Sequence, residues 1–204
     1  MYKRYIKRTL DFILAALGSV ILLPLHILIA ITIKVESKGP VFFLQKRIGR
    51  YKKYFHIIKY RTMRIDAPKD VPTHQLSNPE QYITRIGKVL RKTSLDELPQ
   101  VLNILVGQMS IVGPRPALWN QDDLVAERDK YGANDVRPGL TGWAQVNGRD
   151  ELEIPVKAKL DGEYVRRMSI LFDLRCFIST IGTVINHRGI VEGVKSRNTD
   201  NGRT

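Results

Sequence analysis

Cysteine is almost absent from the 204-residue chain, because Cys176 is its only one. A single cysteine excludes an internal disulfide and a cysteine-based zinc cluster, which suits a reducing compartment, and Cys176 itself is expected to be a small buried hydrophobic residue. The chain also lacks glycine-rich phosphate loops, the nucleophile elbow of serine hydrolases and the paired histidines of zinc proteases. Its histidines lack metal-ligand spacing and are expected to be ordinary surface or core residues: His26, His56, His74 and His187.

Acidic residues are scarce as well, since 33 Lys and Arg face 20 Asp and Glu and give a formal net charge of +13. Such a balance predicts an anionic neighbour, which could be nucleic acid, an anionic membrane surface or a phosphate-rich substrate. Charge alone does not choose among the three. The hydrophobic content of 43% predicts a packed core, and the length suits one domain with an appendage.

One long segment has no formal charge: residues 12–33, or about 33 Å of helix at 1.5 Å per residue. Both flanks of this run are basic, so the positive-inside rule gives no orientation. Pro24 lies in the middle and predicts a kink. We therefore favour a re-entrant helix that enters the membrane, bends and leaves by the same face, with a kinked spanning helix as the alternative.

The remaining chain is expected to be mainly α with a small β hairpin, an α+β domain. Residues 41–45 and 54–60 are predicted strands, and helical periodicity is expected over residues 83–90, 95–105, 119–131 and 153–168. The apolar stretch 170–185 is predicted either to lie in the membrane interface or to pack in the core. The expected organisation is a basic N-terminus with a membrane helix (1–38), a cytosolic catalytic domain (39–186) and a polar tail (187–204), with a surface loop over 66–79.

Two adjacent acids, Asp96 and Glu97, follow Arg91 closely at an expected helix start. One interpretation is structural, because Ser94 and Glu97 have the spacing of a capping box. Pro99 weakens that interpretation, since it falls inside the second turn and favours a helix that begins nearer residue 98. Adjacent acids also occur at two other places in the chain, so the pair alone does not establish catalysis.

The alternative interpretation is chemical. A carboxylate near a helix N-terminus and basic side chains is expected to stay ionised, ready to attack phosphorus and form an acyl phosphate. Asp96 is the candidate nucleophile. Successive helical side chains point about 100° apart, so Glu97 could instead bind a Mg²⁺ ion that bridges phosphate oxygens.

Two further segments could bind a nucleotide or its phosphates. The stiff turn 113–116 fixes the direction of Arg115, and a guanidinium held in this way suits bidentate phosphate binding. Residues 137–149 form a glycine-rich stretch with amides, an indole and arginines that could cradle a nucleotide. Each segment is equally compatible with an exposed turn.

The order of these segments resembles the bacterial sugar transferase family, and specifically its small monotopic phosphoglycosyl transferases, over nearly the whole chain. Any one motif could arise by chance, but the ordered set is specific. The motifs that carry the resemblance are residues 7–11, 39–49, 59–63, 94–100, 103–116 and 137–149. Residue 23 departs from the family pattern, because many relatives have Ser before the helix-breaking proline and this chain has Leu23–Pro24.

The resemblance implies a re-entrant membrane helix on the cytoplasmic face of the bacterial inner membrane, a catalytic Asp-Glu dyad, Mg²⁺, a UDP-sugar donor and polyprenyl (undecaprenyl) phosphate as acceptor. Asp96 is expected to take the phosphosugar with loss of UMP, and the polyprenyl phosphate then attacks the covalent intermediate. The sugar stays open, with an N-acetylated hexosamine as a first guess. Membrane lipids are the other expected partner and nucleic acid is not expected.

The residues and the resemblance together give three groups of candidates. The candidates are Asp96 and Glu97 for catalysis and the metal; Lys59, Arg91, Pro114, Arg115, Pro116, Arg137, Gln145, Asn147 and Arg149 for substrate; and Arg8, Asp11 and Pro24 for the geometry of the membrane helix. Two non-catalytic alternatives remain: a basic membrane-tethered protein that binds nucleic acid, and a scaffold of a polysaccharide-assembly complex.

Overall fold

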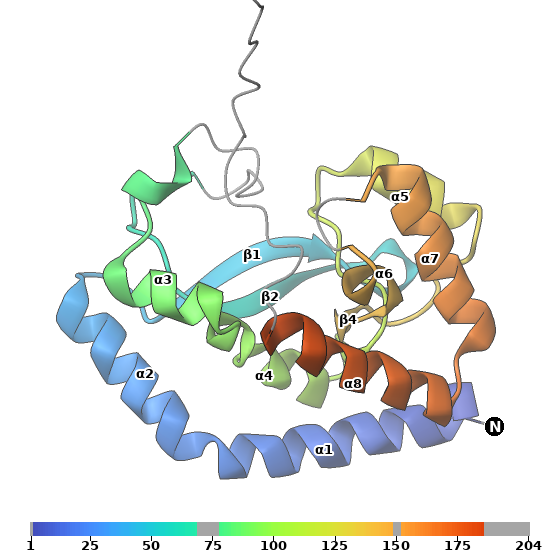
Figure 1. The fold of residues 1–204 in the computed structure, drawn as a ribbon, viewed down its shortest axis with the longest axis horizontal. Helices are drawn as coiled ribbons and strands as arrows, with labels where there is room; N and C mark the ends of the chain where they lie inside the picture. The colour runs from blue at the N-terminus through green and yellow to red at the C-terminus, as the bar shows by residue number, and fades with distance from the viewer. Residues whose placement is uncertain (1, 69–77, 149–151, 186–204) are drawn as a thin grey trace, which may run out of the picture.

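The computed structural model describes residues 2–68, 78–148 and 152–185 (Figure 1). In this part of the chain helices dominate and two small two-stranded sheets accompany them, which confirms the predicted α+β class. Most of the expected surface loop, the polar tail and Arg149 lie outside the described residues. The proposed division of the chain into three parts stays a prediction.

A bent pair of helices runs along one edge of the molecule (Figure 1). After a short π-helical turn (Tyr2–Ile6), α1 (Lys7–Ile21) and α2 (Leu23–Glu36) meet at an angle of 62°. Pro24 lies in the first turn of α2, where its missing N–H costs no helical hydrogen bond. Among the described residues no single helix has the length and apolar content to cross a membrane, whereas this pair taken together meets that test.

The predicted hairpin is present and lies above this pair. Strand β1 (Phe42–Ile48) is antiparallel to β2 (Tyr54–Tyr60), with Phe43 opposite Lys59. A 3₁₀ turn (Arg50–Lys52) joins the strands, and Tyr51 and Lys52 adopt positive φ in it. The hairpin therefore extends three residues further along the first strand than the sequence pattern indicated.

The segment after the hairpin contains the largest difference from the predicted helices. Helix α3 (Arg85–Lys92) begins at Thr84, whose hydroxyl oxygen accepts a hydrogen bond from the Gly87 N–H. The expected helix over 95–105 is instead a 3₁₀ turn, η5 (Leu95–Glu97), followed by α4 (Gln100–Leu105). Pro99 precedes α4, which agrees with the expectation that proline delays the helix start.

The C-terminal half adds a parallel strand pair that was not predicted. Strands β3 (Ser110–Val112) and β4 (Gly139–Thr141) are only three residues long, too short for a periodic signal. The remaining elements are η4 (Pro79–Gln81), α5 (Asp122–Asp129), α6 (Trp143–Val146), α7 (Ile154–Arg167) and α8 (Ile170–Ile185). Helices α5 and α7 lie within the ranges expected to be helical.

Apolar contacts hold the bent helix pair against the rest of the domain. Ala15 of α1 packs in one cluster with Phe55 and Ile57 of β2 and with Ile104 of α4. On α2, Ile29 and Ile33 pack with Tyr60 and Leu90. Leu95 and Leu98 lie against this second cluster. The turn that carries Asp96 and Glu97 therefore packs against a cluster that α2 shares with β2 and α3.

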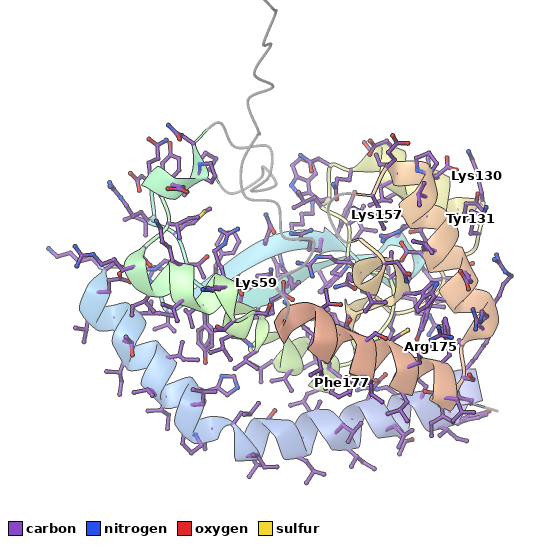
Figure 2. All side chains as sticks on the ribbon, in the orientation of Figure 1. Lys59, Lys130, Tyr131, Lys157, Arg175 and Phe177 are labelled. Atoms are coloured by element: carbon purple, nitrogen blue, oxygen red, sulfur yellow. The ribbon has the colours of Figure 1, made fainter. Side chains whose placement is uncertain are left out.

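Helix α8 packs in the core along one side and is exposed along others. Phe172 and Cys176 on one side are buried in the core, which confirms the expectation for the cysteine. Leu171, Leu174 and Phe177 on other sides are exposed. Figure 2 labels Phe177 on the part of α8 that faces α1 in this view.

Candidate active site

The candidate acids lie in the η5 turn, beside strand β2. Ser94 adopts a left-handed conformation (φ 57°), which turns the chain sharply after α3 and places the next two acids against the strand. The side chain of Ser94 makes no capping hydrogen bond, so the predicted capping box is wrong. Its physical basis is absent because η5 is a single 3₁₀ turn and Glu97 bonds to side chains from other elements.

Glu97 is shared by two cations from distant parts of the chain. Lys59 Nζ and Arg115 Nη2 each lie 2.7 Å from Glu97 Oε1, and Arg115 Nη1 is 3.5 Å from Oε2. Burial raises the pKa of Glu97, but the charges and hydrogen bonds of Arg115 and Lys59 outweigh it and hold the pKa well below its usual range. Glu97 is therefore ionised at neutral pH.

Asp96 has a different electrostatic environment although it is adjacent. Its Oδ2 lies 3.9 Å from Lys59 Nζ, and 14% of its side chain is exposed. Burial, followed by the Glu97 charge, raises the pKa of Asp96, while Lys59, Arg91 and Arg115 act in the opposite direction. The basic neighbours were expected to dominate, but desolvation of a carboxylate outweighs charges at this longer range. The two adjacent acids thus differ in their electrostatic environment.

The Pro-Arg-Pro turn reaches the site because strand β1 holds it. Arg47 Nη1 donates to the Pro116 carbonyl at 3.0 Å, and the guanidinium also donates to Gln45 Oε1. The Ile48 N–H donates to the Ala117 carbonyl at 2.9 Å. Sequence reasoning did not assign Gln45 or Arg47 to the site. Three consecutive long polar side chains, Gln45, Lys46 and Arg47, in an otherwise apolar strand were the available signal.

Asn103 is a third residue that sequence reasoning did not assign to the site. Its Oδ1 accepts from the Ile58 N–H at 3.0 Å, while its Nδ2 donates to the His56 carbonyl and to Gln108 Oε1, both at 2.8 Å. The side chain is 1% exposed. It fixes α4, which follows the acids, to the strand that carries Lys59. A buried asparagine on an expected amphipathic helix was its only signal.

Three substrate candidates from the glycine-rich stretch bond away from the two acids. Arg137 Nε donates to the Gly107 carbonyl, Gln145 Nε2 to the Leu140 carbonyl, and Asn147 Nδ2 to the Trp143 carbonyl. The glycines here allow close backbone packing, since a Cβ at position 139 or 142 would overlap the backbone of residue 113. Pro114, in turn, accepts the residue 139 N–H at 2.9 Å and joins this stretch to the Pro-Arg-Pro turn.

The candidates on the first helix anchor α1 to the domain. Arg8 donates to the Ile104 and Leu105 carbonyls at 2.6 and 2.9 Å. Asp11 accepts from the Ser110 hydroxyl at 2.7 Å and from the Ile111 N–H at 3.0 Å. Both residues therefore act where α1 begins, one helical turn apart, and hold it against α4 and β3.

The two carboxylates form a donor set that fits a magnesium ion. Mg²⁺ commonly takes one or two carboxylates and completes its shell with water and substrate phosphates. Asp96 and Glu97 provide oxygen ligands on a single turn and retain some exposure, 14% and 18% of their side chains. Across residues 2–68, 78–148 and 152–185, no group of three or more His, Cys, Asp and Glu side chains could hold a metal by itself.

This arrangement defines a class of site: paired acids among converging cations, suited to phosphate chemistry, beside an exposed apolar helix pair. The profile of the family described as bacterial sugar transferase matches residues 2–187. The chain belongs to that family, as the sequence motifs predicted.

Individual relatives agree with this assignment. An undecaprenyl-phosphate glucose phosphotransferase of Komagataeibacter xylinus is 40% identical over 185 residues, 86% of this chain and 35% of that protein. A UDP-glucose:undecaprenyl-phosphate glucose-1-phosphate transferase of Escherichia coli is 38% identical over 87% of this chain and 40% of that protein. The exopolysaccharide production protein ExoY of Sinorhizobium fredii is 36% identical over 90% and 87%. The chain thus spans well under half of the first two relatives.

Proposed function

We propose that the chain transfers a phosphosugar from a UDP-sugar to polyprenyl phosphate, releasing UMP and forming a polyprenyl-diphosphate-sugar. The observation that carries this proposal is the convergence of Lys59 and Arg115 on Glu97, beside Asp96. The names of the undecaprenyl-phosphate relatives support the same reaction. Such a transfer is the first membrane step in building a polysaccharide or glycoconjugate.

Asp96 acts as the nucleophile in the first half-reaction. One of its carboxylate oxygens attacks the β-phosphorus of the donor, the bond from that phosphorus to the bridging oxygen breaks, and UMP leaves with the electron pair. The product is an acyl phosphate that joins Asp96 to the sugar phosphate. Asp96 suits this role better than Glu97, because its Lys59 contact is 3.9 Å whereas Glu97 is held at 2.7 Å by two cations.

The second half-reaction regenerates the carboxylate. A phosphate oxygen of the polyprenyl phosphate attacks the same phosphorus, the bond to Asp96 breaks, and the new diphosphate leaves. No proton needs to move, since both the nucleophile and the leaving carboxylate are anions. Donor and acceptor therefore react in turn at one carboxylate, which predicts ping-pong kinetics.

Lys59 and Arg115 stabilise the charge on the phosphates. Both cations rest on Glu97, and the side chain of Arg115 is 37% exposed, so it can turn to a diphosphate that offers equivalent acceptor oxygens. Bound Mg²⁺ would add positive charge at those oxygens, held by Glu97 and Asp96. Arg91 contributes its charge from the end of α3.

The bent helix pair is the membrane element of this proposal. More than half of the exposed large apolar side chains of the described residues lie on α1, α2 and α8: Phe12, Ile13, Leu14, Leu17, Val20, Ile21, Leu23, Ile27, Leu28, Ile31, Val35, Ile170, Leu171, Leu174, Phe177, Ile178 and Ile181. The pair enters the bilayer from the cytoplasmic face, turns back at the 62° bend and leaves by the same face, while α8 lies in the interface. This geometry supports a monotopic, re-entrant topology at the bacterial inner membrane.

Activity can be tested with detergent-solubilised protein, Mg²⁺, undecaprenyl phosphate and a UDP-sugar, measuring UMP. UDP-glucose is the first donor to test, because two relatives carry its sugar in their names, and a UDP-N-acetylhexosamine is the second. Asp96→Asn is expected to lower turnover by about 1,000-fold or more, because the nucleophile is lost. Asp122→Asn, in another adjacent acid pair that is exposed, is the matched control and should leave turnover within about two-fold.

Two results would contradict this mechanism. Undiminished turnover by Asp96→Asn removes that residue as the nucleophile, and kinetics that require both substrates to be bound together exclude the covalent scheme. Without acceptor, the wild-type protein should release one UMP per active site and carry a phosphosugar adduct by mass spectrometry. Asp96→Asn should show neither.

The topology can be tested with single cysteines placed at Lys3 and Lys38 in a Cys176→Ala background. A membrane-impermeant thiol reagent applied to intact cells should label neither site, and permeabilised cells should be labelled at both. Labelling of only one end in intact cells would show ends on opposite faces and overturn the re-entrant proposal.

A further inference from the structure

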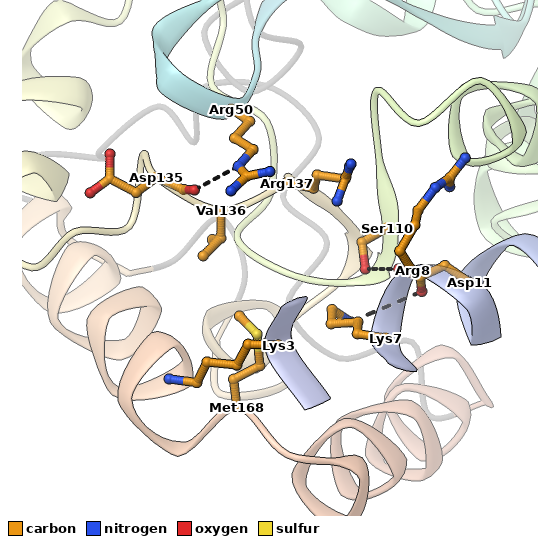
Figure 3. Close-up of a pocket in the computed structure, with 10 residues that line it drawn as sticks. All are labelled: Lys3, Lys7, Arg8, Asp11, Arg50, Ser110, Asp135, Val136, Arg137 and Met168. Carbon is orange, nitrogen blue, oxygen red and sulfur yellow. Dashed lines mark hydrogen bonds and ion pairs between the residues drawn. The ribbon is translucent and has the colours of Figure 1, made fainter. Parts of the chain in front are cut away.

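A basic pocket of about 380 Å³ lies at the start of α1, apart from the candidate active site (Figure 3). Its wall is formed by the N-terminal turn and the start of α1, by the turn of the β1–β2 hairpin, and by residues 135–137, which precede β4. Five of its ten lining residues are basic and two are acidic. Neither the two candidate acids nor their two cations line it.

The acids of the pocket do not neutralise its arginines. Asp11 accepts its hydrogen bonds from Ser110 and from the next backbone N–H, while Arg50 Nε donates to the backbone carbonyl of Asp135, not to its carboxylate (Figure 3). Lys7, also in the wall, is held by Asp173 at 2.7 Å. Asp11 offsets part of the charge on Arg137, but among the described residues no hydrogen bond joins either carboxylate to the three arginines, whose charges are thus only partly balanced.

Three arginines, Arg8, Arg50 and Arg137, line this pocket together. Each donates to backbone carbonyls, and within the described part of the chain none forms an ion pair with a carboxylate. Burial, followed by the charges of Arg50 and Arg8, lowers the pKa of Arg137. Like charges this close raise the free energy of the pocket unless an anion lies between them.

The anion that best matches three guanidinium groups is a phosphate. Guanidinium forks bind phosphate oxygens through paired, charge-assisted hydrogen bonds. The position favours a phosphate at the membrane surface, because the exposed apolar residues Phe12 and Ile13 follow Arg8 by about one helical turn. A headgroup in the pocket could thus keep its acyl chains beside α1.

We propose that Arg8, Arg50 and Arg137 form a second anion site that binds a phosphate group, carried by an anionic lipid headgroup or free in solution. The site fixes the start of α1 to the hairpin turn and to the segment before β4. It is separate from the cluster of Asp96, Glu97, Lys59 and Arg115, and it stands whether or not the proposed transferase reaction is correct. Lys3, whose ammonium donates to the Val165 carbonyl at 2.6 Å, closes the opposite wall.

The test is thermal unfolding of the full chain in detergent, with two matched pairs of additives. Short-chain phosphatidylglycerol is compared with phosphatidylcholine, and inorganic phosphate with chloride at equal ionic strength. Phosphatidylglycerol is expected to raise the Tm of the wild-type protein by about 3 °C or more over phosphatidylcholine. A rise with inorganic phosphate as well identifies the phosphate group itself as sufficient, whereas a rise with phosphatidylglycerol alone identifies the lipid as the source.

Arg50→Gln should abolish the Tm shift, because one of the three guanidinium groups is lost. The fold should be retained, since Arg50 lies on the hairpin turn and the hydrogen bonds that anchor α1 stay in place. Lys53→Gln removes the same charge from an exposed side chain of the same loop outside the pocket and should retain the full shift. Lys3→Gln is a second pocket variant and should reduce the shift. Equal shifts in Arg50→Gln and Lys53→Gln, or no shift in the wild type with either phosphate additive, would overturn the proposal.

Discussion

Two charged networks tie distant parts of the chain together, and they use their charges differently. At the start of α1, Asp173 accepts hydrogen bonds from Lys7 at 2.7 Å, Tyr2 at 2.5 Å and Tyr164 at 2.8 Å. The side chains of Lys7 and Asp173 are each 11% exposed. Both oxygens of Asp173 are bonded within the protein, which is the expected state of a buried charge in a structural role.

The network around Glu97 in the candidate active site is more open to solvent. Arg115 and Lys59 share one oxygen of Glu97, and Arg115 is 37% exposed. Asp96 touches the same lysine only at 3.9 Å. A cation that shares an acceptor and reaches solvent can exchange that acceptor for a phosphate. Both networks contain acids and bases in close contact. They differ in whether their cations are available to bind a phosphate.

Of the variants that distinguish these two networks, Glu97→Gln should have the largest effect, because it removes the charge on which both site cations rest. Turnover is expected to fall on the order of 100-fold or more, measured as UMP release, while the Tm stays within about 4 °C. Glu127→Gln, which breaks only a surface pair with Lys130, is the matched control. A Glu97→Gln protein with near-normal turnover would place this cluster with the structural networks.

Asp173→Asn should have the opposite profile. It removes the counter-charge 2.7 Å from the buried Lys7 and leaves only Asp11 at 4.0 Å, so the free energy of unfolding is expected to fall by about 3 kcal/mol, while the turnover of the folded fraction is retained. Thermal unfolding in detergent measures the first quantity and UMP release per folded molecule the second. Adding Lys7→Met removes the unpaired charge and should recover at least about 1 kcal/mol. A normal Tm in Asp173→Asn would show that the network is not stabilising.

Arg47→Lys should have a smaller effect on turnover. A lysine cannot donate to Gln45 and the Pro116 carbonyl with the geometry of a guanidinium, so the Pro-Arg-Pro turn loses one support. We expect kcat to fall by roughly 10-fold with little change in KM for the acceptor. Arg64→Lys, at an exposed arginine paired with Asp66, is the control and should have no effect. An unchanged kcat in Arg47→Lys would show that Arg115 is positioned without β1.

Much of this site could be predicted from the sequence, because its charged residues are recognisable by their type and spacing. Asp96, Glu97, Lys59 and Arg115 were all named from acid spacing, a stiff turn and ordered motifs, and they converge in three dimensions. The convergence itself could not be derived. It depends on a left-handed residue at Ser94, and a serine carries no strong signal for positive φ.

Supporting residues were harder to predict than the charged ones. Asn103 and Arg47 act through carbonyls and amides of other elements, and backbone groups have no sequence signature of their own. The same reason explains the missed β3–β4 pair, whose three-residue strands are placed by glycine contacts between them. Arg137, predicted from its loop as a substrate residue, lines the basic pocket together with Arg8 and Arg50, and its substrate role stays a prediction.

The smallest effect is expected from Leu23→Ser, which introduces the serine that the family resemblance leads us to expect before the proline. The bend between α1 and α2 already has its backbone groups paired: the Leu22 N–H donates to the Gly18 carbonyl and the His26 N–H to the Leu22 carbonyl, both at 2.9 Å. The His26 ring is also 2.5 Å from the Tyr60 hydroxyl, which ties α2 to β2. A serine hydroxyl therefore has little to add, and the Tm in detergent should change by less than about 2 °C. Leu28→Ser, at another exposed apolar position of α2, measures the cost of a hydroxyl in this helix without the bend. If the Tm of Leu23→Ser lies several degrees above that of the control, a backbone group at the bend is unpaired in the wild-type protein.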